Sequence, residues 1–256
     1  MTRARQTLIG LTLAAAITAA FVALHVYGVF VLRWSPVTVA LAPLLVAAEC
    51  WLGAGLFIVA HDAMHGSLAP GRPKLNRAVG QACLAIYAAF PYERLSHKHY
   101  AHHRHSGGEG DPDFHTGAPR SFWRWYAKFF REYFGVRQMA TITGVFLVYW
   151  LVLGAPVLNC LLFWALPTIG SSLQLFLFGT WLPHRHDDEP FVDRHNARTL
   201  AFPGWLSLLT SFHFGYHREH HLWPQTPWWD LPRRQRELAS PPVKPGLATV
   251  RARAEA

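Results

Sequence analysis

Histidines at helical spacing are the residues of this sequence best suited to chemistry. Two segments carry the pattern His-x-x-His-His and a third carries His-x-x-x-His. On a helix, positions i, i+3 and i+4 lie on one face, so each segment would direct its imidazoles to one side. The clustered residues are His61, His65, His99, His102, His103, His217, His220 and His221.

This pattern predicts a metal centre. Imidazole is the commonest side-chain metal ligand. Eight imidazoles are enough for two ions with four each, whereas one zinc ion needs only three or four ligands. A histidine-rich surface or a pH-sensing patch is the alternative. Two His-x-x-His-His groups and a third pair, among sixteen histidines in all, favour the metal.

Membrane helices are the elements that must position these histidines. The chain has 256 residues, of which 51% are hydrophobic and 15% charged, against roughly 25% charged in soluble domains. A spanning helix needs about 20 apolar residues. Three runs meet this requirement and a fourth is short. We expect spans at residues 8–32, 37–60, 139–153 and 157–182, the third of which could extend a few residues at either end, with a hinge at Gly154-Ala155-Pro156 between the last two.

The expected fold is an all-α integral membrane protein with four transmembrane helices. Shorter apolar or amphipathic segments at residues 75–92 and 120–137 predict additional interfacial or re-entrant helices. We expect one domain over residues 1–239 and a disordered tail over residues 240–256.

Charge predicts the orientation of these spans. Basic residues collect in cytoplasmic loops. With four spans, Arg33 alone of the 24 lysines and arginines falls on the far side. Both termini and all the histidine clusters are therefore expected on the cytoplasmic side of a bacterial inner membrane. The net charge of +9 is then a topology signal, and no motif supports nucleic-acid binding.

Four longer motifs resemble a known family. HDAMHGSL (61–68), DPDFH (111–115), TWLPHRH (180–186) and FHFGYHREHH (212–221) are similar to motifs of bacterial beta-carotene ketolases. These enzymes belong to the membrane fatty-acid desaturase and hydroxylase superfamily. The resemblance covers roughly residues 5–232. It implies a desaturase-like fold with a histidine-rich di-iron centre.

The resemblance also implies an activity. A di-iron oxygenase would convert C4, and C4′, of β-ionone rings to ketones by two successive hydroxylations and loss of water. Beta-carotene would give echinenone and then canthaxanthin, and zeaxanthin would be converted toward astaxanthin. The reaction would need O₂ and electrons from reduced ferredoxin, with the carotenoid delivered from membrane lipid. Iron is implied by the resemblance alone, because imidazole also suits zinc, which the purified protein could carry.

Two other classes of function are alternatives at this stage, and a third is disfavoured. A carotenoid hydroxylase or a fatty-acid desaturase or hydroxylase would use the same site but stop after one oxidation. A membrane metal transporter would place its ligands near the bilayer midplane, whereas these histidines lie where helices leave the membrane. A zinc metalloprotease is disfavoured, because the segment from His61 to His65 lacks the glutamate of His-Glu-x-x-His.

The resemblance extends the ligand set beyond the eight clustered histidines. Related desaturases use a further histidine in an Asn-x-x-x-His motif. Here Thr180 stands in place of the asparagine, and His184 becomes the ninth expected ligand, with His186 as its rival. Residues expected beside the ligands, where a carboxylate could fix an imidazole tautomer, are Asp62, Asp111, Asp113, His115, His186, His213 and Glu219. The alternative for each acid is a solvated loop position.

Apolar residues near the ends of the spans predict a slot for the substrate. Phe57, Phe178 and Trp181 approach the region where His61 and His184 leave the membrane, although plain helix packing is an equal alternative. Within the spans, Glu49 is either functional or hydrogen-bonded to a neighbouring helix. His25 lies in the first span, away from the clusters, and is expected to be dispensable.

Overall fold

The computed structural model describes residues 1–240, and this part of the chain is entirely helical, without strands. Three apolar stretches are long enough to cross a membrane: Arg3–Val31, Pro36–Met64 and Val157–His184. A fourth candidate is the bent pair Phe122–Tyr133 and Val136–Val152, whose two parts meet at 76°. The all-helical membrane fold is therefore confirmed. The predicted tail lies outside the described residues, apart from Ser240.

Most helices follow one another with short connections, and the two long ones are residues 106–121 and 185–203. The first half contains α1 (Arg3–Val26) with its π-helical end η1 (Tyr27–Val31), α2 (Pro36–Met64), α3 (Pro73–Ala88), α4 (Tyr92–His105) and α5 (Phe122–Tyr133). Next come α6 (Val136–Leu147) with η2 (Val148–Val152), and one continuous helix built from α7 (Val157–Cys160), η3 (Leu161–Ala165), α8 (Leu166–Phe176), η4 (Leu177–Trp181) and α9 (Leu182–His184). The chain ends with α10 (Gly204–Ser211), α11 (His217–Leu222), η5 (Trp228–Asp230) and α12 (Leu231–Ala239).

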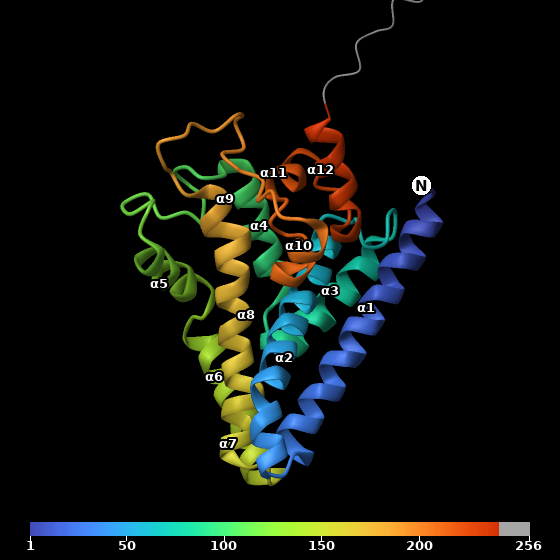
Figure 1. Cartoon of the computed structure of the whole chain (residues 1–256), viewed down its shortest axis with the longest axis vertical. Helices are drawn as coiled ribbons and strands as arrows, with labels where there is room; N and C mark the ends of the chain where they lie inside the picture. The colour runs from blue at the N-terminus through green and yellow to red at the C-terminus, as the bar shows by residue number, and fades with distance from the viewer. Residues whose placement is uncertain (241–256) are drawn as a thin grey trace, which may run out of the picture.

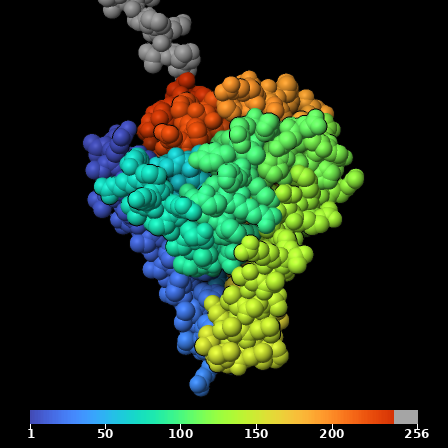
Figure 2. Space-filling model, turned by 180° about the vertical axis from the view of Figure 1, so that it is seen from behind, coloured from blue at the N-terminus to red at the C-terminus, as the bar shows by residue number. Residues whose placement is uncertain are grey.

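The long helices converge at one end of the molecule and diverge at the other (Figure 1). The turns α1–α2 and α6–α7 lie at the narrow end. The N-terminus, α4, α9, α11 and α12 lie at the wide end. Seen from behind, α3 and α4 cover the face beside α1 (Figure 2). Every helix that carries a clustered histidine therefore reaches the wide end, which is the arrangement that a shared site requires.

Hydrogen bonds join the helix ends at the narrow end of the molecule. Asn159, at the start of the last span, donates from its amide to the carbonyl oxygen of Leu32 at 3.0 Å. Its own carbonyl oxygen accepts a hydrogen bond from the indole of Trp34 at 2.9 Å. Ser35 and Thr38 cap the N-terminus of α2 reciprocally, with Pro36 in the first helical position. These contacts fix the α1–α2 hairpin to the α6–α7 hairpin.

Glu49 and His25 form a buried pair between α2 and α1. His25 Nδ1 lies 2.9 Å from Glu49 Oε1, and Glu49 is only 1% exposed. This contact favours the hydrogen-bonded alternative for Glu49. Removal of His25 would leave a buried carboxyl group without its partner, while the expectation that His25 is dispensable for the reaction stays a prediction. His25 stabilises helix packing and belongs to neither histidine group of the wide end.

Phe212 anchors the segment that leads into α11. Its ring stacks on Trp51 of α2 at 4.4 Å and meets Trp228 edge-on at 5.2 Å. Gly55 of α2 makes room for this ring, because a Cβ atom at Gly55 would lie 2.6 Å from Phe212 Cζ. Position 212 adopts a left-handed conformation with φ of 50°. The close approach of α2 to Phe212 therefore fixes the position of α11.

We expect Gly55→Ala to destabilise the fold by about 1–3 kcal/mol, because the added methyl group overpacks this contact. Gly144→Ala is the matched control, since nothing lies within 4 Å of a Cβ atom at that position on α6. Thermal unfolding in detergent would compare both variants with the parent chain. Equal unfolding temperatures for the two variants would show that Phe212 is not held in this way.

Candidate metal centre

Four helix ends supply the histidines of the wide end. His61 and His65 come from the end of α2, and His184 ends α9, while α4 and α11 contribute three histidines each to the site. Their nitrogen atoms form two groups, within each of which all ligand atoms lie within 4.8 Å of one another. One group contains His61, His65, His99, His103 and His220, and the other contains His102, His184, His217 and His221. The structure thus brings together all nine histidines expected as ligands.

Imidazole nitrogens converge within each group. In the five-histidine group, the Nε2 atom of His99 lies 2.6 Å from that of His65 and 3.1 Å from that of His103. In the four-histidine group, the Nε2 atom of His221 lies 3.2 Å from that of His102 and 3.1 Å from that of His217. Nitrogen ligands about 2.0–2.1 Å from one ion lie at most about 4.2 Å apart. Both groups have the compactness of a ligand set.

Hydrogen bonds on the far side of two rings leave Nε2 free for a cation. His102 Nδ1–H donates to Asp111 at 2.9 Å, and His184 Nδ1–H donates to the carbonyl oxygen of Asn196 at 2.7 Å. A neutral imidazole ring that carries its proton on Nδ1 keeps a lone pair on Nε2. The Nε2 atoms of His61 and His184 are buried and have no hydrogen-bond partner within residues 1–240. Such orphaned groups cost about 1–3 kcal/mol each, so the residues present fit bound metal ions.

The electrostatics of the site favour neutral imidazoles. Burial, followed by neighbouring imidazoles, lowers the pKa of His99, His217 and His220 well below the usual value. A neutral ring can donate its lone pair to a metal, whereas a protonated ring cannot. For His102, burial also acts to lower the pKa, but the neighbouring carboxylate of Asp111 outweighs it and leaves the pKa raised. His102 and Asp111 thus form the carboxylate–histidine arrangement common beside metals.

The other expected acids have different contacts. Asp113 lies 3.8 Å from His102 Nδ1 and accepts a hydrogen bond from the hydroxyl group of Tyr133. Asp62 accepts the backbone N–H of Trp228 at 3.0 Å, while His61 Nδ1 lies 4.0 Å away, beyond hydrogen-bond range. Glu219 accepts a hydrogen bond from Thr199 at 2.8 Å. Asp62 and Glu219 therefore do not orient a histidine in this structure, which corrects that expectation.

The remaining expected histidines lie outside both groups. His186 Nε2–H donates to the carbonyl oxygen of Gly107 at 3.0 Å, and its ring packs against Phe114. His213 stacks on Tyr216, and His115 is half-buried. The geometry thus separates His184, which joins a ligand group, from its rival His186.

Several partners of the site had no sequence signal. Asn196 and Thr199 lie in an irregular segment and Trp228 begins the short helix η5, and all three contact site residues through chain folding alone. Tyr133 was assigned only to an interfacial helix, yet its hydroxyl group reaches Asp113. No helical spacing links these residues to the histidines that they support.

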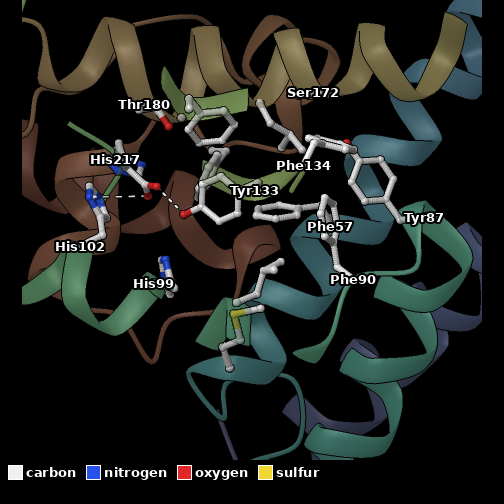
Figure 3. Close-up of a pocket in the computed structure, with 17 residues that line it drawn as sticks. Phe57, Tyr87, Phe90, His99, His102, Tyr133, Phe134, Ser172, Thr180 and His217 are labelled. Atoms are coloured by element: carbon white, nitrogen blue, oxygen red, sulfur yellow. Dashed lines mark hydrogen bonds and ion pairs between the residues drawn. The ribbon is translucent and has the colours of Figure 1, made fainter. Parts of the chain in front are cut away.

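An apolar cavity, here called the metal cavity, adjoins the histidines (Figure 3). His99, His102 and His217 lie at one end, and Tyr87 and Phe90 lie at the other. The further lining residues are Phe57, Met64, Leu95, Asp113, Phe129, Tyr133, Phe134, Ser172, Leu175, Gly179, Thr180 and Phe214. The cavity has a volume of ≈ 60 Å³, so an apolar ring could lie with one end against the histidines only after the lining side chains move apart.

Of the three expected slot residues, Phe57 alone lines this cavity. Phe178 packs against Phe202 at 6.3 Å, and Trp181 packs edge-on against Phe122 of α5 at 5.3 Å. The last span turns these two side chains away from the cavity, and α5 covers Trp181. The expectation that Phe178 and Trp181 form the slot is therefore corrected.

Comparison with known proteins gives the family. The sequence profile of fatty acid desaturases matches residues 34–143 and 134–250, which together span most of the chain. The chain belongs to the fatty acid desaturase family. No solved structure matches it.

Curated relatives within the desaturase family are carotenoid ketolases by name. A beta-carotene ketolase from Paracoccus sp. (strain PC1) is 47% identical over 90% of this chain and 94% of its own. A beta-carotene ketolase from Haematococcus lacustris is 37% identical over 93% of this chain and 82% of its own. A zeaxanthin 4-ketolase from Chlamydomonas reinhardtii is 36% identical over 94% of this chain and 56% of its own. The resemblance to beta-carotene ketolases seen in the motifs is confirmed.

We expect this desaturase-family chain to bind two metal ions through imidazoles alone, one in each histidine group. His184→Ala should lower the bound metal from about two ions per chain toward one, because it removes one of the four imidazoles of its group. His186→Ala is the matched control and should retain both. Elemental analysis of purified protein measures this, and an unchanged metal content in His184→Ala would contradict the assignment.

Proposed function

We propose that this chain is a membrane oxidoreductase that converts C4, and then C4′, of carotenoid β-ionone rings to ketones. The observation that carries the proposal is the metal cavity. It presents two groups of convergent imidazoles at one end and aromatic walls along its length. An apolar ring in this cavity would lie directly against the metal-binding end. The ketolase names of relatives that match over most of the chain support the same substrate class.

The nine histidines would hold two iron ions, with His102 and His184 oriented by Asp111 and by the carbonyl oxygen of Asn196. When bound, iron would supply the O₂-dependent redox chemistry that an unactivated C–H bond requires and that zinc cannot provide. Each hydroxylation consumes one O₂, two electrons and two protons, and releases one water. A second hydroxylation at the same carbon gives a geminal diol, which loses water to become the ketone.

The chain's own residues would hold the ring and exclude water. Phe57, Tyr87 and Phe90 surround the end of the cavity remote from the histidines. Tyr133 and Thr180 place two hydroxyl groups in the wall, and the Tyr133 hydroxyl group is already held by Asp113. A ring enclosed in this way keeps the same carbon at the site for two oxidations. A hydroxylase would instead release the alcohol after one.

The proposal includes a location and an electron donor. The N-terminus and the metal centre lie at the same end of the molecule, and the opposite end carries Arg33 as its single basic residue among residues 1–240. By the distribution of positive charge, the wide end faces the cytoplasm of a bacterial inner membrane. A reduced ferredoxin-type protein would then supply electrons from that side, and the carotenoid would come from the lipid.

Expression in a host that accumulates beta-carotene tests the function. We expect ketones to accumulate, and we expect His103→Ala and His217→Ala to abolish them, because each removes one converging imidazole. His97→Ala is the control, since His97 is exposed on α4 and belongs to neither group. Chromatography of the pigments measures the products. Accumulation of alcohols without ketones would identify a hydroxylase instead.

A further inference from the structure

A second apolar cavity adjoins the metal cavity on the side away from the histidines. It lies between α6 and the stretch from Cys160 to Ile169 of the last span, and its volume is ≈ 290 Å³. We call it the lipid-side groove. Its lining residues are Ala88, Phe130, Phe134, Met139, Ile142, Thr143, Phe146, Cys160, Leu161, Trp164, Ala165, Thr168 and Ile169.

One aromatic residue separates the two cavities. Phe134 lines both of them. Its ring meets Phe90 edge-on at 5.0 Å and stacks on Phe130 at 4.4 Å. Phe134 lies in the break between α5 and α6, and the following residue, Gly135, has nothing within 4 Å of its Cβ position. A side chain at such a bend can change rotamer without displacing a packed helix.

We propose that the two cavities form one carotenoid-binding channel. The reacting ring occupies the metal cavity, the polyene passes Phe134 into the lipid-side groove, and the far ring projects into the membrane. This inference rests on the proposed function and names the part of the protein that holds the rest of the substrate.

The dimensions agree with this occupant. The polyene of a C40 carotenoid is roughly 20 Å long if each bond advances as in an extended backbone. From Cys160 to Ile169 the groove follows nine helical rises, or about 14 Å. From Phe57 to Met64, the two residues of α2 that line the metal cavity, there are seven rises, or about 11 Å. The metal cavity is left for the reacting ring, and the groove is shorter than the polyene, so the far ring lies beyond the groove.

The outer wall of the groove faces the surroundings of the spans. Met139 is 45% exposed, Leu161 51% and Ile169 48%. These apolar residues belong to candidate membrane segments, so the groove opens to lipid. A third cavity, beside His25, shares no lining residue with the metal cavity, but it shares Ala88, Ile142 and Trp164 with the lipid-side groove and therefore adjoins it.

A lipid-exposed far ring has a chemical consequence. Nothing in the channel contacts its substituents, so the chain can accept a substrate whose far ring is unmodified, hydroxylated or already a ketone. This tolerance is needed if both ends of one carotenoid are to be oxidised at a single site.

Filling the groove tests the channel. We expect Ala165→Trp to lower kcat/KM for beta-carotene at least about tenfold, because the indole occupies the path of the polyene. Leu166→Trp is the matched control, because Leu166 is the next residue but is 46% exposed and lines none of the three cavities. It should change kcat/KM less than about twofold. Similar values for the two variants would overturn the proposal.

Labelling supplies a readout that is independent of turnover and of the folding of Ala165→Trp. In chains with Cys50, Cys83 and Cys160 replaced by alanine, we introduce Ala165→Cys or Leu166→Cys and add a membrane-permeable maleimide. Beta-carotene in phosphatidylcholine vesicles should slow labelling at position 165 but not at position 166. Equal labelling with and without beta-carotene overturns the channel. Protection by phospholipid alone identifies the groove as a lipid site and also overturns it.

The two proposals fail separately. Protection at position 165 without any ketone from the parent chain would support the channel and reject the ketolase. Ketone formation without protection would do the reverse.

Discussion

The convergence of nine imidazoles on a small volume is the constraint on which the rest of the structure depends. To bind a metal, each ring must be neutral with a free lone pair. For the six rings that are buried, this state is costly unless a cation accepts the lone pair. Because the rings come from α2, α4, α9 and α11, four helix ends must meet at one place. Hydrogen bonds of Asn159 hold the helices together at the narrow end, and the helix ends that carry the histidines lie at the wide end. We therefore expect folding and metal binding to be coupled in this chain.

Acidic residues around the centre mainly hold chain segments in place. Asp62 ties η5 to α2 through the N–H of Trp228, and Glu219 ties α11 to the preceding loop through Thr199. Only Asp111 holds a histidine of the four-histidine group within hydrogen-bond distance, while His184 relies on a backbone carbonyl oxygen. Carboxylates that accept hydrogen bonds from neighbouring chain segments are not available to bind the metal, which agrees with a ligand set made of imidazoles.

Local patterns predicted the parts of this molecule that depend on local physics. Long apolar runs identified α1, α2 and the last span, and the spacing of histidines identified their common faces. The bend between α5 and α6, the partition into groups of five and four, and the partners of Asp62 and Glu219 depend on tertiary packing, which no spacing encodes. Phe178 and Trp181 failed as slot residues for the same reason. Proximity along a helix does not say which face a neighbour such as Phe122 will cover.

Shape must hold the substrate, because lipid is as apolar as the cavity and burial alone gains little. Each contact with Phe57, Tyr87 or Phe90 contributes only about 0.1–0.2 kcal/mol per atom pair, so retention depends on many contacts around a rigid ring. This is enough to keep one carbon at the site while the channel encloses the polyene. The enclosed chain cannot reverse inside the channel, however. In the proposed channel, oxidation of the second ring would require the molecule to leave past Phe134, turn in the lipid and return, so the singly oxidised carotenoid would be released as a free intermediate.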